Sequence, residues 1–299
     1  MCSFLAKTCN FTRFHQDYFE RCLLSVNTPL PIKYGIGEPG YYPGIYLDNF
    51  FYGCSNLKYI PGKMFHAYKY TRYSFCSLAG MFSGCTSLKN IPATIFDGLP
   101  VVAGMYSYSP ASIDSMFNYC SSLGSIPDEL FDNEIFDNVT SATNIFRGCT
   151  SLRDISSDIF SRFSHSCTSF ASAFDNCASL MSVGDLFYGA SSCQDFSGVF
   201  DGCSKLESIS SDLFYGCSSA LKFADAFAGC SKLDSIPSRL FNDCVDRNTM
   251  SFVRCFQNCI GITSAVPELW NQFPSAAGGA CFRNCTNASN YADVPYLWR

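Results

Sequence analysis

The chain has 299 residues, a net charge of −5 and 47% hydrophobic residues. It lacks the basic excess of a nucleic-acid-binding protein, and it is too hydrophobic to be disordered. Its apolar stretches run to only a handful of residues, so we expect no insertion into a membrane. Two counts are unusual for an ordinary enzyme domain, namely 29 phenylalanines and 19 cysteines.

The first segment, residues 1–46, does not follow the pattern of the rest of the chain. It has no apolar run of the kind found in a secretory signal peptide, and it ends in a turn-rich stretch over 35–44. We predict that residues 1–46 cap the first repeat or connect to another chain. The expected location is a cell surface, the extracellular space or a virion, and this segment does not decide among them.

From residue 51 onward the chain repeats the signature Phe-x-x-Cys-x-x-Leu-x-x-Ile-Pro. The nine copies begin at Phe51, Phe82, Phe117, Phe146, Phe174, Phe200 and Phe227, with weaker copies at Phe256 and Phe282. Successive signature cysteines are 26 to 35 residues apart. Repeats of this length are typical of solenoids, so we predict a single solenoid over 47–299, closed at its end by a C-terminal cap.

Each copy carries further apolar residues at fixed distances from its first phenylalanine, here called the anchor. An aromatic residue follows most anchors by fourteen positions, and an apolar residue precedes most anchors by four. One copy cannot bury these alone, whereas stacked copies bury them as continuous columns. Parallel stacking at about 4.8 Å per copy predicts a rod roughly 40 Å long.

Local structure within a copy is only partly determined by the pattern. Cys-x-x-Leu-x-x-Ile-Pro predicts a short extended segment that ends in a turn. Phe-x-x-x-Phe pairs such as Phe170 and Phe174 fit one face of a helical turn and also one side of a strand. We therefore expect short parallel strands, loops and short helical turns, and the pattern leaves both interpretations of these pairs open.

The repeats resemble a known family. The runs FDGCSKLESISSDLF and FAGCSKLDSIPSRLF are similar to BspA-type leucine-rich repeats, and Met81-Phe82-Ser83-Gly84-Cys85-Thr86-Ser87-Leu88 is similar to the core of the bacterial surface-protein repeat of about 26 residues. The resemblance covers roughly residues 47–298. It implies a right-handed solenoid with short parallel strands and a non-enzymatic role in adhesion or recognition. Similar repeats in phage-encoded proteins imply a virion component as the alternative.

The cysteines offer the main candidate for chemistry. Nine of them occupy the same position in successive copies, which predicts a column of buried, reduced thiols. There is no Cys-x-x-Cys and no Cys/His spacing of a zinc site, so we expect neither a metal nor a cofactor. Cys255 and Cys281 share a position in adjacent copies and are expected to approach each other. None of His15, His66 and His165 recurs with the repeat, which makes a cysteine-nucleophile enzyme the weakest hypothesis.

The two longest spacings follow the first and second copies and contain many tyrosines. The candidate binding residues there are Tyr68, Lys69, Tyr70, Arg72, Tyr73, Tyr106 and Tyr108. Tyrosine mixed with serine and glycine is typical of adaptable binding surfaces, although the same tyrosines also suit loop anchors packed on the solenoid. We predict that they bind a protein or a glycan on a cell surface. A virion component would contact neighbouring virion proteins instead, and nucleic acid is expected in neither case.

Overall fold

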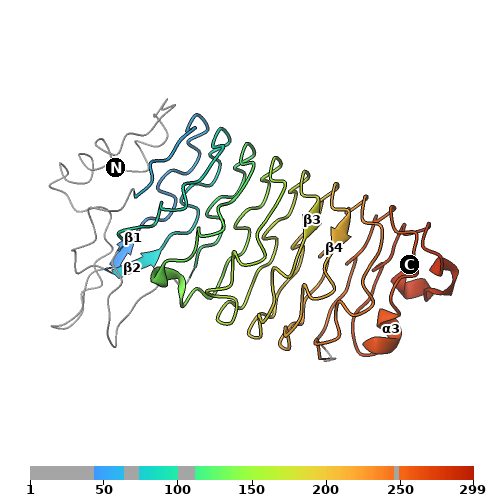
Figure 1. The fold of residues 1–299 in the computed structure, drawn as a ribbon. Helices are drawn as coiled ribbons and strands as arrows, with labels where there is room; N and C mark the ends of the chain where they lie inside the picture. The colour runs from blue at the N-terminus through green and yellow to red at the C-terminus, as the bar shows by residue number, and fades with distance from the viewer. Residues whose placement is uncertain (1–43, 64–73, 100–111, 246–248) are drawn as a thin grey trace.

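The computed structural model describes residues 44–63, 74–99, 112–245 and 249–299, and in these ranges successive copies form coils stacked side by side along one axis (Figure 1). The repeat solenoid expected from the sequence is therefore confirmed. The regular elements are short: β1 (Gly44–Tyr46), β2 (Ser74–Ser77), η2 (Glu134–Phe136), β3 (Ser182–Val183), β4 (Ser208–Ile209), α3 (Leu269–Gln272), η3 (Tyr291–Asp293) and η4 (Tyr296–Trp298). None of the described helices has the length and apolarity to cross a bilayer.

Strand pairing between coils is parallel, as expected, but it is sparse. β1 pairs with β2 and β3 pairs with β4, and each sheet contains two strands. Other neighbouring coils are joined by isolated parallel β-bridges instead of strands. One series of bridges links equivalent residues of successive coils, namely Ser112, Ser141, Ser169, Asp195, Lys222, Ser251 and Ala277. The right-handed winding implied by the family resemblance stays a prediction.

The anchor segments are neither helices nor strands, which resolves the two interpretations left open by the Phe-x-x-x-Phe pairs. They are tandem turns, in which residues that donate their backbone N–H to the next coil alternate with residues that donate it within the same coil. In the first copy the N–H groups of Leu47, Asn49, Phe51 and Gly53 donate to the carbonyls of Ser77, Ala79, Met81 and Ser83 in the next coil, at 2.7 to 3.1 Å. The residues between them donate within the coil to the carbonyl three positions earlier.

The tandem turns explain why glycine stands two residues after several anchors. The residues two before and two after each anchor have positive φ, as at Asn49 (56°) and Gly53 (72°) in the first copy. A turn that needs positive φ at its third position favours glycine and asparagine, because other side chains are strained there. The repeated Phe-x-Gly-Cys and Phe-x-Asn-Cys runs are therefore signatures of turn geometry.

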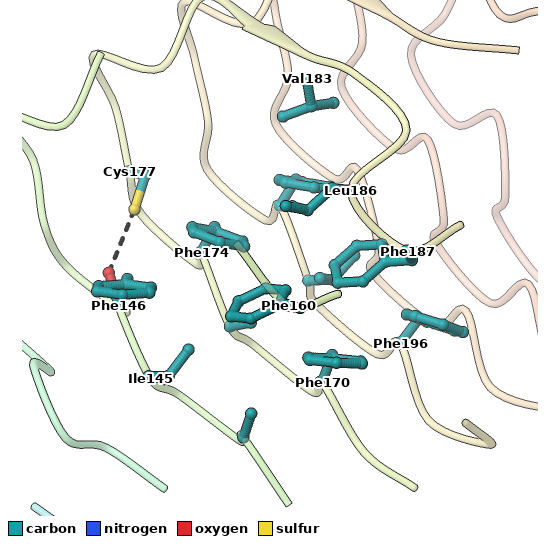
Figure 2. Close-up of a cluster of buried hydrophobic side chains, with 14 of the residues drawn as sticks. Ile145, Phe146, Phe160, Phe170, Phe174, Cys177, Val183, Leu186, Phe187 and Phe196 are labelled. Carbon is teal, nitrogen blue, oxygen red and sulfur yellow. Dashed lines mark hydrogen bonds between the residues drawn. The ribbon is translucent and has the colours of Figure 1, made fainter. Parts of the chain in front are cut away.

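The core consists of columns of phenylalanine rings that run along the stack. The nine anchors form one column, in which neighbouring rings are stacked with centroids 5.1 to 5.8 Å apart. A second column, here called the corner column, contains Phe96, Phe131, Phe160, Phe187, Phe214 and Phe241 at 5.7 to 6.4 Å. Figure 2 shows rings of both columns, with Phe146 and Phe174 from the anchor column and Phe160 and Phe187 from the corner column. The side of the solenoid on which the corner column lies is here called the corner side.

Residues 296–298 pack on the coil of the ninth copy. Phe282 and Ala280 donate to the carbonyls of Trp298 and Leu297 at 2.7 and 2.9 Å, so η4 adds one more rung to the stack. The ring of Trp298 is buried and lies directly against Gly278. The cap or connector predicted for residues 1–46 falls almost entirely outside the described residues and stays a prediction.

Candidate functional site

The signature cysteines form a hydrogen-bonded column inside the solenoid. From the second copy onward, each thiol lies 3.0 to 3.3 Å from the backbone carbonyl oxygen of the anchor in the preceding copy, as for Cys177 and Phe146 in Figure 2. A thiol is a weak donor that is small enough to be buried like an apolar side chain. The sequence pattern predicted the burial, and the structure adds the bond between coils.

All fifteen cysteines whose side chains are described are buried and free of disulfides. Burial raises the pKa of the Cys149 thiol to about 12, and burial followed by the contact with Cys281 raises that of Cys255. The expected approach of Cys255 to Cys281 is thus confirmed. A nucleophilic cysteine needs an accessible thiolate. These thiols lie inside the core, where burial favours the protonated form. They are suited to packing.

We expect these thiols to react only after unfolding. In native protein at pH 8, an aromatic disulfide reagent should label few of the nine signature cysteines, because their thiolates are disfavoured and shielded. Addition of guanidinium chloride should expose all of them. Mass spectrometry of the labelled peptides gives the reading for each position. Fast native labelling of Cys149 or Cys203 would contradict their placement in the core.

One row of charged side chains crosses the middle coils. Arg147 Nε lies 2.8 Å from Asp175 Oδ2, and Arg254 donates two hydrogen bonds of 2.7 Å to Asp225. Asp201 lies between these pairs. Burial, then the neighbouring carboxylates of Asp175 and Asp225, raise the pKa of Asp201 from 3.8 to about 6. The two arginines pair with the other aspartates, and for Asp201 the effects that raise its pKa outweigh the lowering effects of the Gly202 N–H and Arg147.

Replacement of Asp201 by asparagine should therefore stabilise the protein at pH 7. Because the pKa of Asp201 is higher in the folded state, its contribution to stability is full below about pH 4 and is lost as the pH rises through about 6. Since the carboxyl group is partly exposed, we expect a gain of only about 1 kcal/mol. Urea unfolding should show this gain at pH 7 and little at pH 4. Asp128→Asn, at an exposed position, serves as the control, and equal gains in both variants would contradict the assignment.

The seven binding residues predicted from the sequence, Tyr68, Lys69, Tyr70, Arg72, Tyr73, Tyr106 and Tyr108, all lie outside the described residues. The structure does describe residues that precede these two segments in the chain. Lys63, which precedes the first segment, donates from its backbone N–H to the carbonyl of Thr94 at 2.8 Å. Thr94 lies two residues before Phe96 of the corner column, so the described residues Lys63 and Thr94 meet on the corner side of neighbouring coils.

The structure also presents two tyrosines on that side that the sequence analysis missed. Tyr188 and Tyr215 follow the corner phenylalanines Phe187 and Phe214, and their rings are stacked at 4.8 Å with an angle of 15°. They are 56% and 48% exposed. The signal was present in the sequence, because Phe-Tyr-Gly recurs at 187–189 and 214–216 and matches Phe-Tyr-Gly in the first anchor copy.

Possible metal ligands do not gather into a site in the described part of the chain, where no group of three or more His, Cys, Asp or Glu side chains is arranged to hold an ion.

Comparison with known proteins gave structural matches only. No protein-family model matches the sequence, and no curated protein matches it significantly. A leucine-rich repeat protein of T. pallidum is 22% identical with a TM-score of 0.35, covering 66% of this chain and 73% of its own. A leucine-rich cell surface protein of Faecalibacterium prausnitzii is 20% identical with a TM-score of 0.29, covering 82% and 77%. A leucine-rich repeat protein of Bacteroides ovatus is 16% identical with a TM-score of 0.14, covering 78% and 80%.

These solved structures belong to the leucine-rich repeat class that the signature resembles.

Proposed function

We propose that this chain is a non-enzymatic recognition protein whose solenoid presents tyrosine-rich contacts to a protein or glycan partner at a cell surface. The supporting observation is the division of aromatic residues between core and surface. Of the ten large apolar residues that are exposed among the described residues, six are tyrosines and none is phenylalanine. Tyrosine is favoured at interfaces because its ring offers contact area and its hydroxyl group still forms hydrogen bonds.

The corner side is the proposed recognition face. The described residues Lys63 and Thr94, which precede the predicted tyrosines, are hydrogen-bonded near the corner residue Phe96, and the stacked Tyr188 and Tyr215 follow corner phenylalanines in later coils. Insertions in repeat proteins commonly map to one face, which is often the binding face. A virion component with the same repeats stays an alternative hypothesis from the sequence, because no contact among the described residues favours it.

The proposal is tested with a triple variant, Tyr70, Tyr73 and Tyr108 to serine. We expect unchanged circular dichroism and unfolding, and loss of binding on arrays of printed glycans and of surface proteins, since the ring contacts would be removed. A matched control changes Tyr52, Tyr59 and Tyr119 to serine. These exposed tyrosines do not follow corner phenylalanines and lie outside the proposed recognition face, so this variant should retain binding.

Two results would count against the proposal in different ways. Full binding by the triple variant would remove the loop tyrosines as the site. If the unaltered chain binds nothing on either array, recognition of glycans and proteins as its function is contradicted.

A further inference from the structure

A recess opens on the corner side between the fourth and fifth coils. Its volume is about 270 Å³, and it is lined by Ser157, Asp158, Ser161, Ser164, Asp185, Leu186 and Tyr188. Leu186 and the corner rings Phe160 and Phe187, which flank this region, lie close together in Figure 2. Pockets for drug-sized ligands span roughly 300 to 1,000 Å³, so this recess suits a single small ring.

The recess exists because the two coils differ in length at the corner. Phe160 follows its anchor by fourteen residues and Phe187 by thirteen, so the fifth coil is one residue shorter at this point. After Phe160 the fourth coil makes an additional turn, in which Ser164 donates to the carbonyl of Phe160 at 2.8 Å and Cys167 to that of Phe163 at 2.9 Å. A regular stack would close the space between neighbouring coils, and this mismatch leaves it open.

The recess also lies next to a stacked pair of tyrosine rings, Tyr188 and Tyr215. Tyr188 and Tyr215 occupy the position after the corner phenylalanine in the fifth and sixth coils, and Ser161 occupies it in the fourth. Serine has no ring to continue the stack, so one side of Tyr188 faces the recess that it lines with Ser161. A ligand with a flat apolar face can pack against Tyr188 in place of the missing ring.

Apart from Leu186 and Tyr188, the lining residues are polar. The hydroxyl groups of Ser157, Ser161 and Ser164 both donate and accept hydrogen bonds, and the carboxylates of Asp158 and Asp185 accept them. Asp185 already accepts a hydrogen bond from Ser210. Arg162, which lies between Ser161 and Ser164 in the chain, is paired with Asp137 at 2.6 Å. The lining is therefore rich in hydroxyl groups and carries negative charge, which disfavours an anionic ligand.

We propose that this recess is a subsite for one neutral pyranose sugar, which stacks its C–H face on Tyr188 and directs its hydroxyl groups to the serines and aspartates. The proposal deepens the recognition function above, on which it rests, by naming the ligand class and a site separate from the loop tyrosines. An aromatic platform bordered by groups that hydrogen-bond hydroxyls matches a pyranose, which has an apolar face and a polar rim.

The test is saturation-transfer NMR of the full chain with methyl glucoside, methyl galactoside, methyl mannoside and N-acetylglucosamine, with glucuronate as the anionic comparison. We expect transfer to at least one neutral sugar and none to glucuronate. Ser161→Tyr should fill the recess and weaken binding at least about tenfold. The fold accepts this change because the equivalent residues are already Tyr188 and Tyr215. Tyr188→Ala should weaken binding similarly, and Tyr52→Ala, which removes a ring of matching exposure, should not.

Each contrary result has a distinct meaning. Equal binding by the unaltered chain and by Ser161→Tyr, with both folded by circular dichroism, overturns the subsite even if the chain binds glycan arrays. Absence of transfer to every neutral sugar also overturns it, while array binding that depends on Tyr70, Tyr73 and Tyr108 would leave the recognition function in place. Binding of lysinamide at the recess, in place of the sugars, would show a cation site and overturn the sugar assignment.

Discussion

Phe200→Ala should destabilise the protein by about 3–5 kcal/mol, the range for truncating a fully buried phenylalanine. The ring of Phe200 is fully buried and stacks on Phe174 at 5.6 Å and on Phe227 at 5.5 Å. It also contacts Phe187 of the corner column at 6.1 Å. Its removal leaves a cavity at the centre of two columns, with coils on both sides that cannot close it without breaking their ladder of hydrogen bonds.

The matched control is Phe282→Ala in the last copy. Phe282 stacks on Phe256 at 5.8 Å and meets the edge of Trp270 at 6.3 Å, so it has a stacked ring on one side only. Its loss should cost less, since the terminal coil relaxes more easily. Denaturant unfolding of both variants gives the comparison. Small and equal losses at the two positions would refute the model of stacked columns.

Trp298→Ala should cost about 3 kcal/mol by removing the ring that closes the end of the stack. The Trp298 ring is buried and lies 6.3 Å from Trp270 and 6.4 Å from Phe252. Gly278→Ala should cause a related loss of about 1–3 kcal/mol by overpacking, because an added Cβ would lie 2.1 Å from the Trp298 ring. Exposure of the terminal core should also promote association of the protein.

A double-mutant cycle separates these causes. In the Trp298→Ala background the clash is absent, so Gly278→Ala should then be nearly neutral. Gly279→Ala is the neighbouring control, because a Cβ at Gly279 meets open space, and it should change stability by less than about 0.5 kcal/mol. Thermal unfolding of the four variants and size-exclusion chromatography provide the measurements. Additive losses in the cycle would contradict the contact between Gly278 and Trp298.

The sequence by itself determined the stack and its core. Nine copies of one signature repeat the same apolar positions, and repetition turns a weak local pattern into a strong prediction of columns. The burial of Cys85, Cys149 and Cys203 followed from the same reasoning, because a residue that recurs at one position of every copy faces the same neighbours each time.

Only the tertiary structure decided how the chain turns within each coil and where the coils fail to match. Spacing of four residues suits helices and strands alike, so Phe170 and Phe174 did not reveal tandem turns, which depend on hydrogen bonds to the next coil. The thiol of Cys177 bonds a carbonyl 31 residues earlier, which no local pattern encodes. The recess beside Tyr188 arises because the fourth and fifth coils differ in length at the corner. The repeat signature contains only the positions that all coils share, so it could not predict this recess.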